Sequence, residues 1–262
     1  MSAARILLRA CSYFLGVAVV CAIGASAATS PTRGGSLAQF IERGLPVFCG
    51  GDKGDEVALT FDDGPGPYSS LLVDELRWHA PATFFSIGEN ANANPVADRN
   101  ETTVGVVGEH TETHAILSGL SRPAALAEIV DGRASVERAT GKPVLLFRPP
   151  GDEWTLPDQS LVRKSGMLLV DYTVDPRDWA LRTSSQVSKT VLSDPRLVPG
   201  AIVLLHEYHL STVEAVPMIV AALQRRGFKL VTVPRLLRDD PPTPAEQRAD
   251  EDAHVCVHLF ER

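Results

Sequence analysis

The stretch LTFDDGP, residues 59–65, ends an apolar run with two adjacent aspartates and then a turn. Asp62 and Asp63 repel each other at neutral pH, and a cation beside them would offset that cost. Asp-Gly-Pro is also a common way for a chain to leave a strand, so turn chemistry alone accounts for the same letters. The rest of the chain has to decide between these two interpretations.

Short apolar runs recur along the chain and predict seven strands, at 57–61, 83–87, 104–107, 144–148, 168–172, 202–205 and 230–233. Segments with apolar residues at three- and four-residue spacing predict amphipathic helices at 69–79, 123–140, 156–166, 184–194 and 212–227. Because the strands are nearly all apolar rather than alternating, we expect parallel strands that are buried on both faces. Six or seven such β/α units predict a barrel or a doubly wound sheet.

The composition is that of an ordinary globular protein, with 44% hydrophobic residues, so a core of good size is available. The formal net charge is -7 and no cluster of lysines and arginines is present. We therefore expect no nucleic-acid partner.

Residues 1–27 have the pattern of an export signal. Arg5 and Arg9 precede the apolar stretch YFLGVAVVCAIGA, and Ala25-Ser26-Ala27 follows as a cleavage site. We expect a secreted or periplasmic protein. The apolar stretch is also long enough for a retained membrane anchor, and only in that case would the membrane be a partner.

The cysteines agree with export. Cys11 and Cys21 lie in or beside the apolar stretch, which leaves Cys49 and Cys256 for the mature chain. In an oxidising compartment such a pair predicts a disulfide that closes nearly the whole domain and contributes up to about 5 kcal/mol. Two separately buried thiols are the alternative.

Polar side chains follow five of the predicted strands at the point where each strand ends. They are Asp62 and Asp63, then His110 and His114, then Arg148, then Asp171, Asp175, Asp178 and Trp179, and last His206 and His209. The carboxyl ends of parallel strands meet on one face, and that face holds the active site of such folds.

His110 and His114 are spaced i, i+4, so a helical turn would place both imidazoles on one side. Two histidines with one aspartate form a ligand set that leaves a coordination position open, which favours a metal over two surface histidines. His206 and His209 are a rival pair. We rank that pair lower because one of the two is better used for proton transfer.

Hydrolysis at such a site needs a base for the water and an acid for the leaving group. The aspartate that does not bind the metal is the natural base, and His206 is the natural acid. Arg148 could hold the base ionised, and an acid such as Asp175 could position the guanidinium. A structural ion pair between Arg148 and Asp175 is the simpler alternative.

These residues lie in motifs that resemble a known family. TFDDGP at 60–65, HTETH at 110–114, RPPG at 148–151, DPRDW at 175–179 and LLH at 204–206 have the order and spacing of the polysaccharide deacetylases, carbohydrate esterase family 4. The resemblance covers about residues 53–237. It implies an α/β fold of the type called a distorted, incomplete (β/α) barrel.

The resemblance also implies roles for single residues. Asp62 would be the base, held by Arg148, which Asp175 would support. The divalent metal, with zinc as the first choice, would be bound by Asp63, His110 and His114. His206 would protonate the departing amine, Trp179 would line the apolar side of the pocket, and Leu204 would line the acetyl-methyl pocket.

Gly151 departs from the family, which usually has a tyrosine after RPP. A glycine keeps the backbone N–H that would stabilise the oxyanion, but it loses the ring that would shape the substrate groove. The substrate assignment therefore suffers more than the mechanism.

The resulting hypothesis is a monomeric, metal-dependent hydrolase that removes N-acetyl groups from an acetylated polysaccharide such as peptidoglycan or a chitin-like glycan. Its alternatives are an O-acetyl esterase acting on xylan, another acyl-amide hydrolase, and a non-catalytic carbohydrate-binding relic. The expected division is an export signal at 1–27, an N-terminal segment at 28–52, the catalytic domain at 53–237, and an acidic, Pro-rich, solvated tail at 238–262. A terminal strand at 254–260 is compatible with the pattern HVCVHLF.

Overall fold

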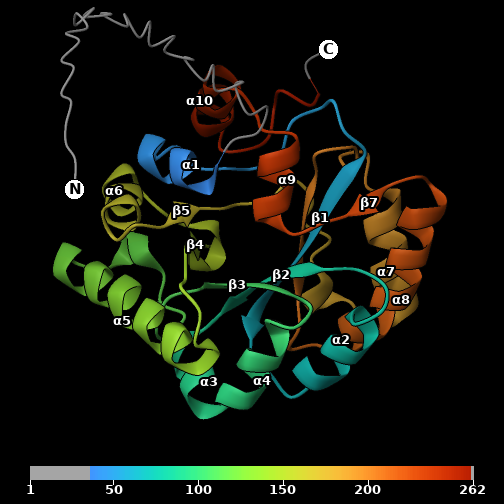
Figure 1. The fold of residues 1–262 in the computed structure, drawn as a ribbon, viewed down its shortest axis with the longest axis horizontal. Helices are drawn as coiled ribbons and strands as arrows, with labels where there is room; N and C mark the ends of the chain where they lie inside the picture. The colour runs from blue at the N-terminus through green and yellow to red at the C-terminus, as the bar shows by residue number, and fades with distance from the viewer. Residues whose placement is uncertain (1–35, 261–262) are drawn as a thin grey trace, which may run out of the picture. The chain divides into compact units, whose positions relative to one another are not determined.

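The computed structural model describes residues 36–260, so the expected export signal lies outside the described residues. The chain forms one parallel sheet in the order β5-β4-β3-β2-β1-β6, with β7 also paired to β1 (Figure 1). The strands are β1 (Glu56–Gly64), β2 (Ala82–Ser86), β3 (Gly105–Glu109), β4 (Leu146–Phe147), β5 (Leu168–Leu169), β6 (Ile202–His206) and β7 (Lys229–Leu230). Each lies at or beside a predicted strand, and every pairing is parallel. The prediction of a parallel sheet is confirmed.

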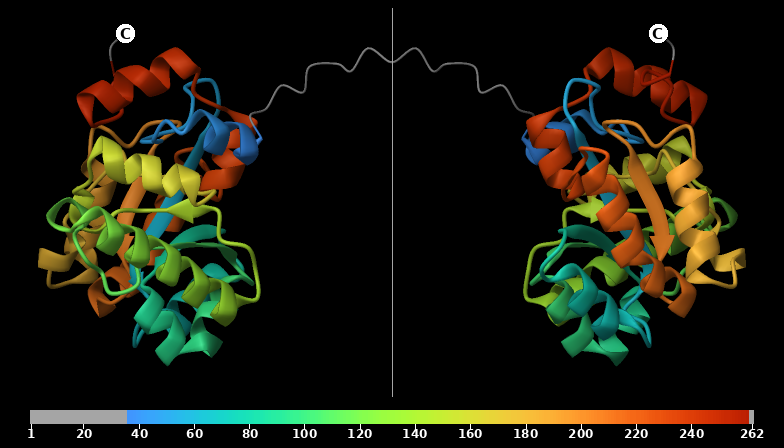
Figure 2. Two further views of the ribbon diagram at one scale, coloured as in Figure 1. Left: turned by 90° about the vertical axis from the view of Figure 1, so that its left-hand side faces the viewer. Right: turned by 90° about the vertical axis from the view of Figure 1, so that its right-hand side faces the viewer.

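Helices surround the sheet (Figures 1 and 2). The predicted helices are present as α2 (Ser69–Leu76), α5 (Arg122–Thr140), α6 (Leu156–Lys164), α7 (Ser184–Ser193) and α8 (Leu210–Arg225). Five more were not predicted: α1 (Leu37–Arg43), α3 (Gly88–Ala93), α4 (Pro95–Glu101), α9 (Val233–Asp239) and α10 (Pro244–Ala253). Within residues 36–260 no helix has the length and apolar character needed to cross a membrane.

The sheet curls into a half-barrel, and short contacts span the gap between its outer strands. Single bridges join Val47 to Val170 just after β5, and Val174 to Val203 of β6. These isolated bridges replace the long strands that would close a full barrel. The expected distorted, incomplete (β/α) barrel is the fold observed.

Both faces of the sheet are buried, as the apolar strands predicted. In β1 the side chains of Val57, Leu59 and Phe61 pack into the larger apolar cluster, and Ala58 packs into a second cluster with Ile202. This alternation is the two-residue period of a strand. It places Thr60 and Asp62 on the same side as Ala58.

The C-terminal segment differs from its prediction. Part of the acidic segment that was expected to be a solvated tail forms the helix α10 instead. A capping box of Thr243 and Glu246 starts this helix. Gln247 and Asp250 are buried on its inner face, and residues 254–260 form turns rather than a strand. The cap and the buried face make the helix more favourable than a solvated coil.

Candidate active site

Asp62 and Asp63 lie at the carboxyl end of β1, where the strand loses its regular geometry. The register with β2 shifts between Asp62 and Gly64, and Asp63 has a left-handed φ of 71°. Neighbours in a regular strand point to opposite faces. Here His110 Nε2 lies 3.8 Å from Asp62 Oδ2 and 3.6 Å from Asp63 Oδ1. The irregularity therefore lets two adjacent aspartates contribute to one site.

His110 and His114 come together through the loop that follows β3. Their ring centroids are 5.0 Å apart. The expected helical turn is absent, because Thr111 and His114 have positive φ angles of 64° and 61° and the loop is irregular. His110 Nδ1 lies 2.7 Å from the carbonyl oxygen of Arg148, and this contact leaves Nε2 to face the aspartates.

Asp63, His110 and His114, here called the strand-end cluster, fit a divalent metal ion. One ligand atom from each residue lies within 4.8 Å of the others. Asp63 Oδ1 is buried and accepts no hydrogen bond, although His114 Nε2 lies 3.3 Å from it. Two imidazoles and one carboxylate suit zinc and leave a position open. The ligand set therefore matches a metal that retains room for substrate.

The electrostatics of this cluster favour metal ligands in their unprotonated forms. Burial alone raises the pKa of Asp63, but the contact with His114 and the charges of His110 and His206 lower it to about 2. Burial lowers the pKa of His110 in spite of both aspartates. Asp63 is therefore an anion and His110 is neutral near pH 7.

Arg148 lies inside the half-barrel and is almost fully buried. Its guanidinium donates to Asp62 Oδ1 at 2.8 Å and to Thr60 Oγ1 at 2.7 Å. It also donates to the carbonyl oxygens of Val170 and Asp171. Four directed hydrogen bonds fix the guanidinium, so Arg148 keeps the Asp62 carboxylate oriented.

Asp175 was expected to support Arg148, and the structure corrects this. Within residues 36–260 the Arg148 guanidinium donates to the four groups named above, and Asp175 is not among them. Asp175 instead accepts the backbone N–H of Arg177 at 2.7 Å. The chain turns just after Val174 joins β6, and Asp175 satisfies a backbone donor of that turn.

The acidic partner that sequence reasoning missed is Asp178, the second aspartate of DPRDW. Its Oδ1 lies 2.8 Å from the ring Nδ1 of His206. Its Oδ2 accepts hydrogen bonds from the backbone N–H of His206 at 2.8 Å and from the Thr212 hydroxyl at 2.6 Å. Burial lowers the pKa of His206, but the hydrogen bond and charge of Asp178 raise it to about 9. His206 is therefore mostly protonated at neutral pH and can act as an acid.

Comparison with known proteins identifies the family to which this chain is similar. The family model for polysaccharide deacetylases matches residues 50–170. A peptidoglycan-N-acetylglucosamine deacetylase of Bacillus cereus is 35% identical over 190 residues, which cover 70% of this chain and 88% of that protein. A chitooligosaccharide deacetylase of Bradyrhizobium sp. (strain ANU 289) is 34% identical, with 69% of this chain and 90% of that protein covered.

The chain belongs to the polysaccharide deacetylase family. Its fold agrees with a crystal structure of the Bc1960 peptidoglycan N-acetylglucosamine deacetylase at a TM-score of 0.70 and 28% identity, with 76% of this chain and 95% of that chain covered. The protein is thus an enzyme, a polysaccharide deacetylase, as the motifs predicted. The strand-end cluster lies at the active-site face of a deacetylase fold.

The remaining motif residues of this deacetylase occupy different environments. Leu204 is buried in β6 beside Thr60, whereas Trp179 is 50% exposed in the short helix Asp178–Ala180. Gly151 has a φ of 67°, and a Cβ there would lie 2.9 Å from Ile116 Cδ1. The backbone at 151 thus favours glycine, and a tyrosine would need a different loop conformation.

His209, the rival metal ligand, is the N-cap residue of α8. The centroid of its ring lies 6.5 Å from that of the His206 ring. Neither residue belongs to a group of three or more ligand side chains within residues 36–260. The lower rank given to this pair agrees with that geometry.

A buried acidic group next to the deacetylase site was not predicted either. Glu207 follows His206 in the chain and accepts a hydrogen bond from the Ser69 hydroxyl. Asp98 accepts a hydrogen bond from the Ser86 hydroxyl at 2.6 Å. Burial raises the pKa of Asp98 to about 6 and that of Glu207 to about 8, and burial and Glu207 raise the pKa of Glu101. No ion pair within residues 36–260 involves these carboxyl groups. Glu207 therefore keeps its proton near neutral pH, whereas Asp98 loses most of its own.

Proposed function

We propose that this deacetylase removes N-acetyl groups from an extracytoplasmic N-acetylglucosamine polysaccharide, such as peptidoglycan or a chitin-like glycan. The observation that carries the proposal is the convergence of Asp62, held by Arg148, with the strand-end cluster within 4 Å. The names of the two curated relatives, one acting on peptidoglycan and one on chitooligosaccharides, support this substrate class.

Asp63, His110 and His114 would hold the divalent metal, and their donor set favours zinc. When bound, the metal polarises the acetyl carbonyl and favours ionisation of water at the site. The Arg148 carbonyl holds the Nδ1–H of His110, so that Nε2 stays directed at the cluster.

Asp62 is proposed to take a proton from the attacking water as the oxygen forms its bond to the acetyl carbon. Arg148 keeps Asp62 Oδ1 fixed, so Oδ2, which faces His110, is the oxygen available for that proton. A carboxylate in this position acts as a general base.

His206 is proposed to donate its proton to the amide nitrogen as the C–N bond breaks, which releases acetate and a free amine. Asp178 holds the imidazolium by hydrogen bonding to Nδ1, so the proton to be donated is on Nε2. The Gly151 N–H is the proposed donor to the oxyanion, with Leu204 beside the acetyl methyl and Trp179 against the sugar.

We also propose that residues 53–237 form the catalytic region and that the protein is exported. The disulfide between Cys49 and Cys256, discussed below, supports an oxidising compartment.

Acetate release from N-acetylglucosamine oligomers and from peptidoglycan tests the function. The metal-stripped protein, the zinc-restored protein and Asp62→Asn should be compared, with Asp74→Asn at an exposed position as the matched control. We expect zinc to restore activity and Asp62→Asn to lower it by about 10²–10⁴-fold while zinc stays bound. Full activity in a folded, zinc-loaded Asp62→Asn protein would exclude the proposed base. Release only from acetylated xylan would shift the assignment to O-acetyl esters.

A further inference from the structure

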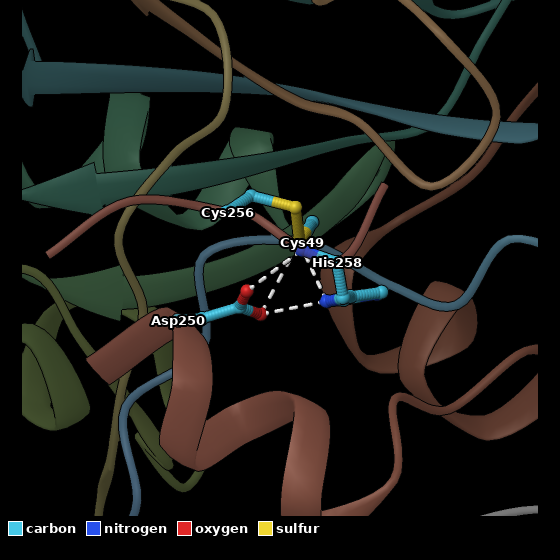
Figure 3. Close-up of side chains that lie close together, drawn as sticks. All are labelled: Cys49, Asp250, Cys256 and His258. Carbon is cyan, nitrogen blue, oxygen red and sulfur yellow. Dashed lines mark hydrogen bonds and ion pairs between the residues drawn. A yellow bond between two sulfur atoms is a disulfide. The ribbon is translucent and has the colours of Figure 1, made fainter. Parts of the chain in front are cut away.

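A second group of side chains of metal-ligating types joins a residue just before β1 to three residues of the C-terminal segment. Cys49, Asp250, Cys256 and His258, here called the tail cluster, each have a ligand atom within 4.8 Å of the others (Figure 3). Cys49 and Cys256 form the predicted disulfide, with Cα atoms 5.9 Å apart. Asp250 and His258, which sequence reasoning did not assign, lie against it.

The two non-sulfur groups are aimed at the sulfur atoms. His258 Nδ1 lies 3.8 Å from Cys49 Sγ, and Asp250 Oδ2 lies 3.6 Å from the same atom. His258 Nδ1 and Asp250 Oδ2 are themselves 2.8 Å apart. Once the S–S bond is broken, a small cation could lie between these sulfur, nitrogen and oxygen atoms, which are all within 4.8 Å of one another.

The outer contacts of these groups are those of a metal site. His258 Nε2 lies 3.1 Å from the carbonyl oxygen of Gly50, so an N–H there is held and Nδ1 is left to bind. Asp250 Oδ1 accepts the backbone N–H groups of Val257 and His258, so Oδ2 is the oxygen that faces His258 Nδ1 and the sulfur atom of Cys49. Such outer-shell hydrogen bonds orient ligating histidines and carboxylates in zinc proteins.

We propose that the tail cluster is a second metal site, which binds zinc through two thiolates, His258 Nδ1 and Asp250 Oδ2 when the cysteines are reduced. The disulfide and the zinc complex would then be alternative links between the segment before β1 and the segment after α10. Two cysteines, a histidine and a carboxylate give the four-coordinate, closed set typical of structural zinc.

The reaction balances in two steps. A dithiol reductant supplies two electrons and two protons, breaks the S–S bond and becomes a disulfide itself. Zinc then replaces both thiol protons as the four ligand bonds form. Zinc binding at this cluster should therefore release protons to the buffer.

The test uses the full chain with Cys11→Ser and Cys21→Ser, so that Cys49 and Cys256 are the remaining thiols. The chain is unfolded, reduced with a dithiol, and refolded without oxygen in the presence of cobalt(II) or zinc. Metal content and thiolate-to-cobalt absorption are compared with those of the oxidised protein. This measurement needs no substrate, so its outcome is independent of the proposed deacetylation.

We expect the reduced chain to bind one metal equivalent more than the oxidised chain and to show the thiolate absorption. His258→Asn should weaken the added binding by at least about 10-fold. His79→Asn, an exposed histidine in the loop after α2, should leave it unchanged. A chain with Cys49→Ser and Cys256→Ser should lose the absorption but keep the metal of the strand-end cluster.

Three results would overturn the proposal. The first is equal metal content in the reduced and oxidised proteins. The second is thiolate absorption that is the same in His258→Asn and in His79→Asn. The third is a reduced chain that does not refold with zinc present, because the zinc complex is proposed to replace the disulfide.

Discussion

The strand-end cluster and the tail cluster combine similar side chains but differ in exposure. In the first, the side chains of His114 and Asp63 are 42% and 27% exposed. In the second, those of His258 and Asp250 are 6% and 2% exposed. Catalytic metal sites keep a coordination position open, whereas structural sites are closed. Exposure therefore separates the cluster that can admit a substrate from the cluster that can only link two segments.

The largest expected effect tests this assignment with the same change in each cluster. His114→Asn should lower acetate release by more than about 100-fold, because it removes a ligand from the open cluster. His258→Asn in the oxidised protein should leave activity within about twofold, since that position contributes no group to the site. Initial rates at saturating zinc measure both. Comparable losses in the two variants would show that exposure does not separate the roles.

The next effect concerns stability rather than activity. Replacing both Cys49 and Cys256 by serine should lower the free energy of unfolding by about 2–5 kcal/mol, because the disulfide closes a loop with a sequence separation of 207. Urea unfolding of metal-free, oxidised samples measures the change. An unchanged midpoint would show that the packing of α10 and Asp250 alone holds the tail. Activity of the folded variant serves as the control and should persist.

The difference between the clusters also explains what could be predicted from the sequence. The strand-end cluster follows from β1 and β3, whose apolar runs predicted both the strands and the edge where they end. Parallel strands bring their carboxyl ends together whatever the loops do. The irregularity at Asp63 that brings both aspartates to one site, in contrast, is a local backbone feature that letters alone do not specify.

Loop geometry explains the errors. DPRDW offers two aspartates, and only the turn after Val174 decides that Asp178, rather than Asp175, lies beside His206. The tail was expected to be solvated because of its charge and prolines. Thr243 and Glu246 already form a helix-start pattern there, which would have predicted α10. Asp250 lies beside the disulfide from within that helix, and His258 from the turns that follow it.

A smaller effect tests the corrected aspartate. Asp178→Asn should lower kcat by about 10-fold and move the alkaline limb of the kcat–pH profile down by about one pH unit. The pKa of His206, about 9, is raised above its usual value chiefly by contact with Asp178, so the acid form is lost as pH rises through 9. An asparagine cannot stabilise the imidazolium by charge. Asp175→Asn is the matched control, and an equal shift in that variant would show that contact with Asp178 does not set the pKa of His206.

The smallest effect concerns the buried acidic group of Asp98, Glu101 and Glu207, which consists of carboxyl groups without the histidine that each of the two clusters contains. Glu101→Gln should change stability by less than about 1 kcal/mol at pH 5, because an amide resembles the protonated carboxyl that burial enforces. The folded protein binds protons that the unfolded chain releases above its ordinary carboxyl pKa of 4.5, so stability falls as pH rises. The free energy of unfolding keeps falling as pH rises toward the pKa of Glu207, about 8. Its dependence on pH should be weaker in Glu101→Gln, which has one buried carboxyl group fewer. Urea unfolding at pH 5 and pH 8 measures the slope. A Gln variant that is strongly destabilised at pH 5 would instead mean that Glu101 is ionised in the folded protein.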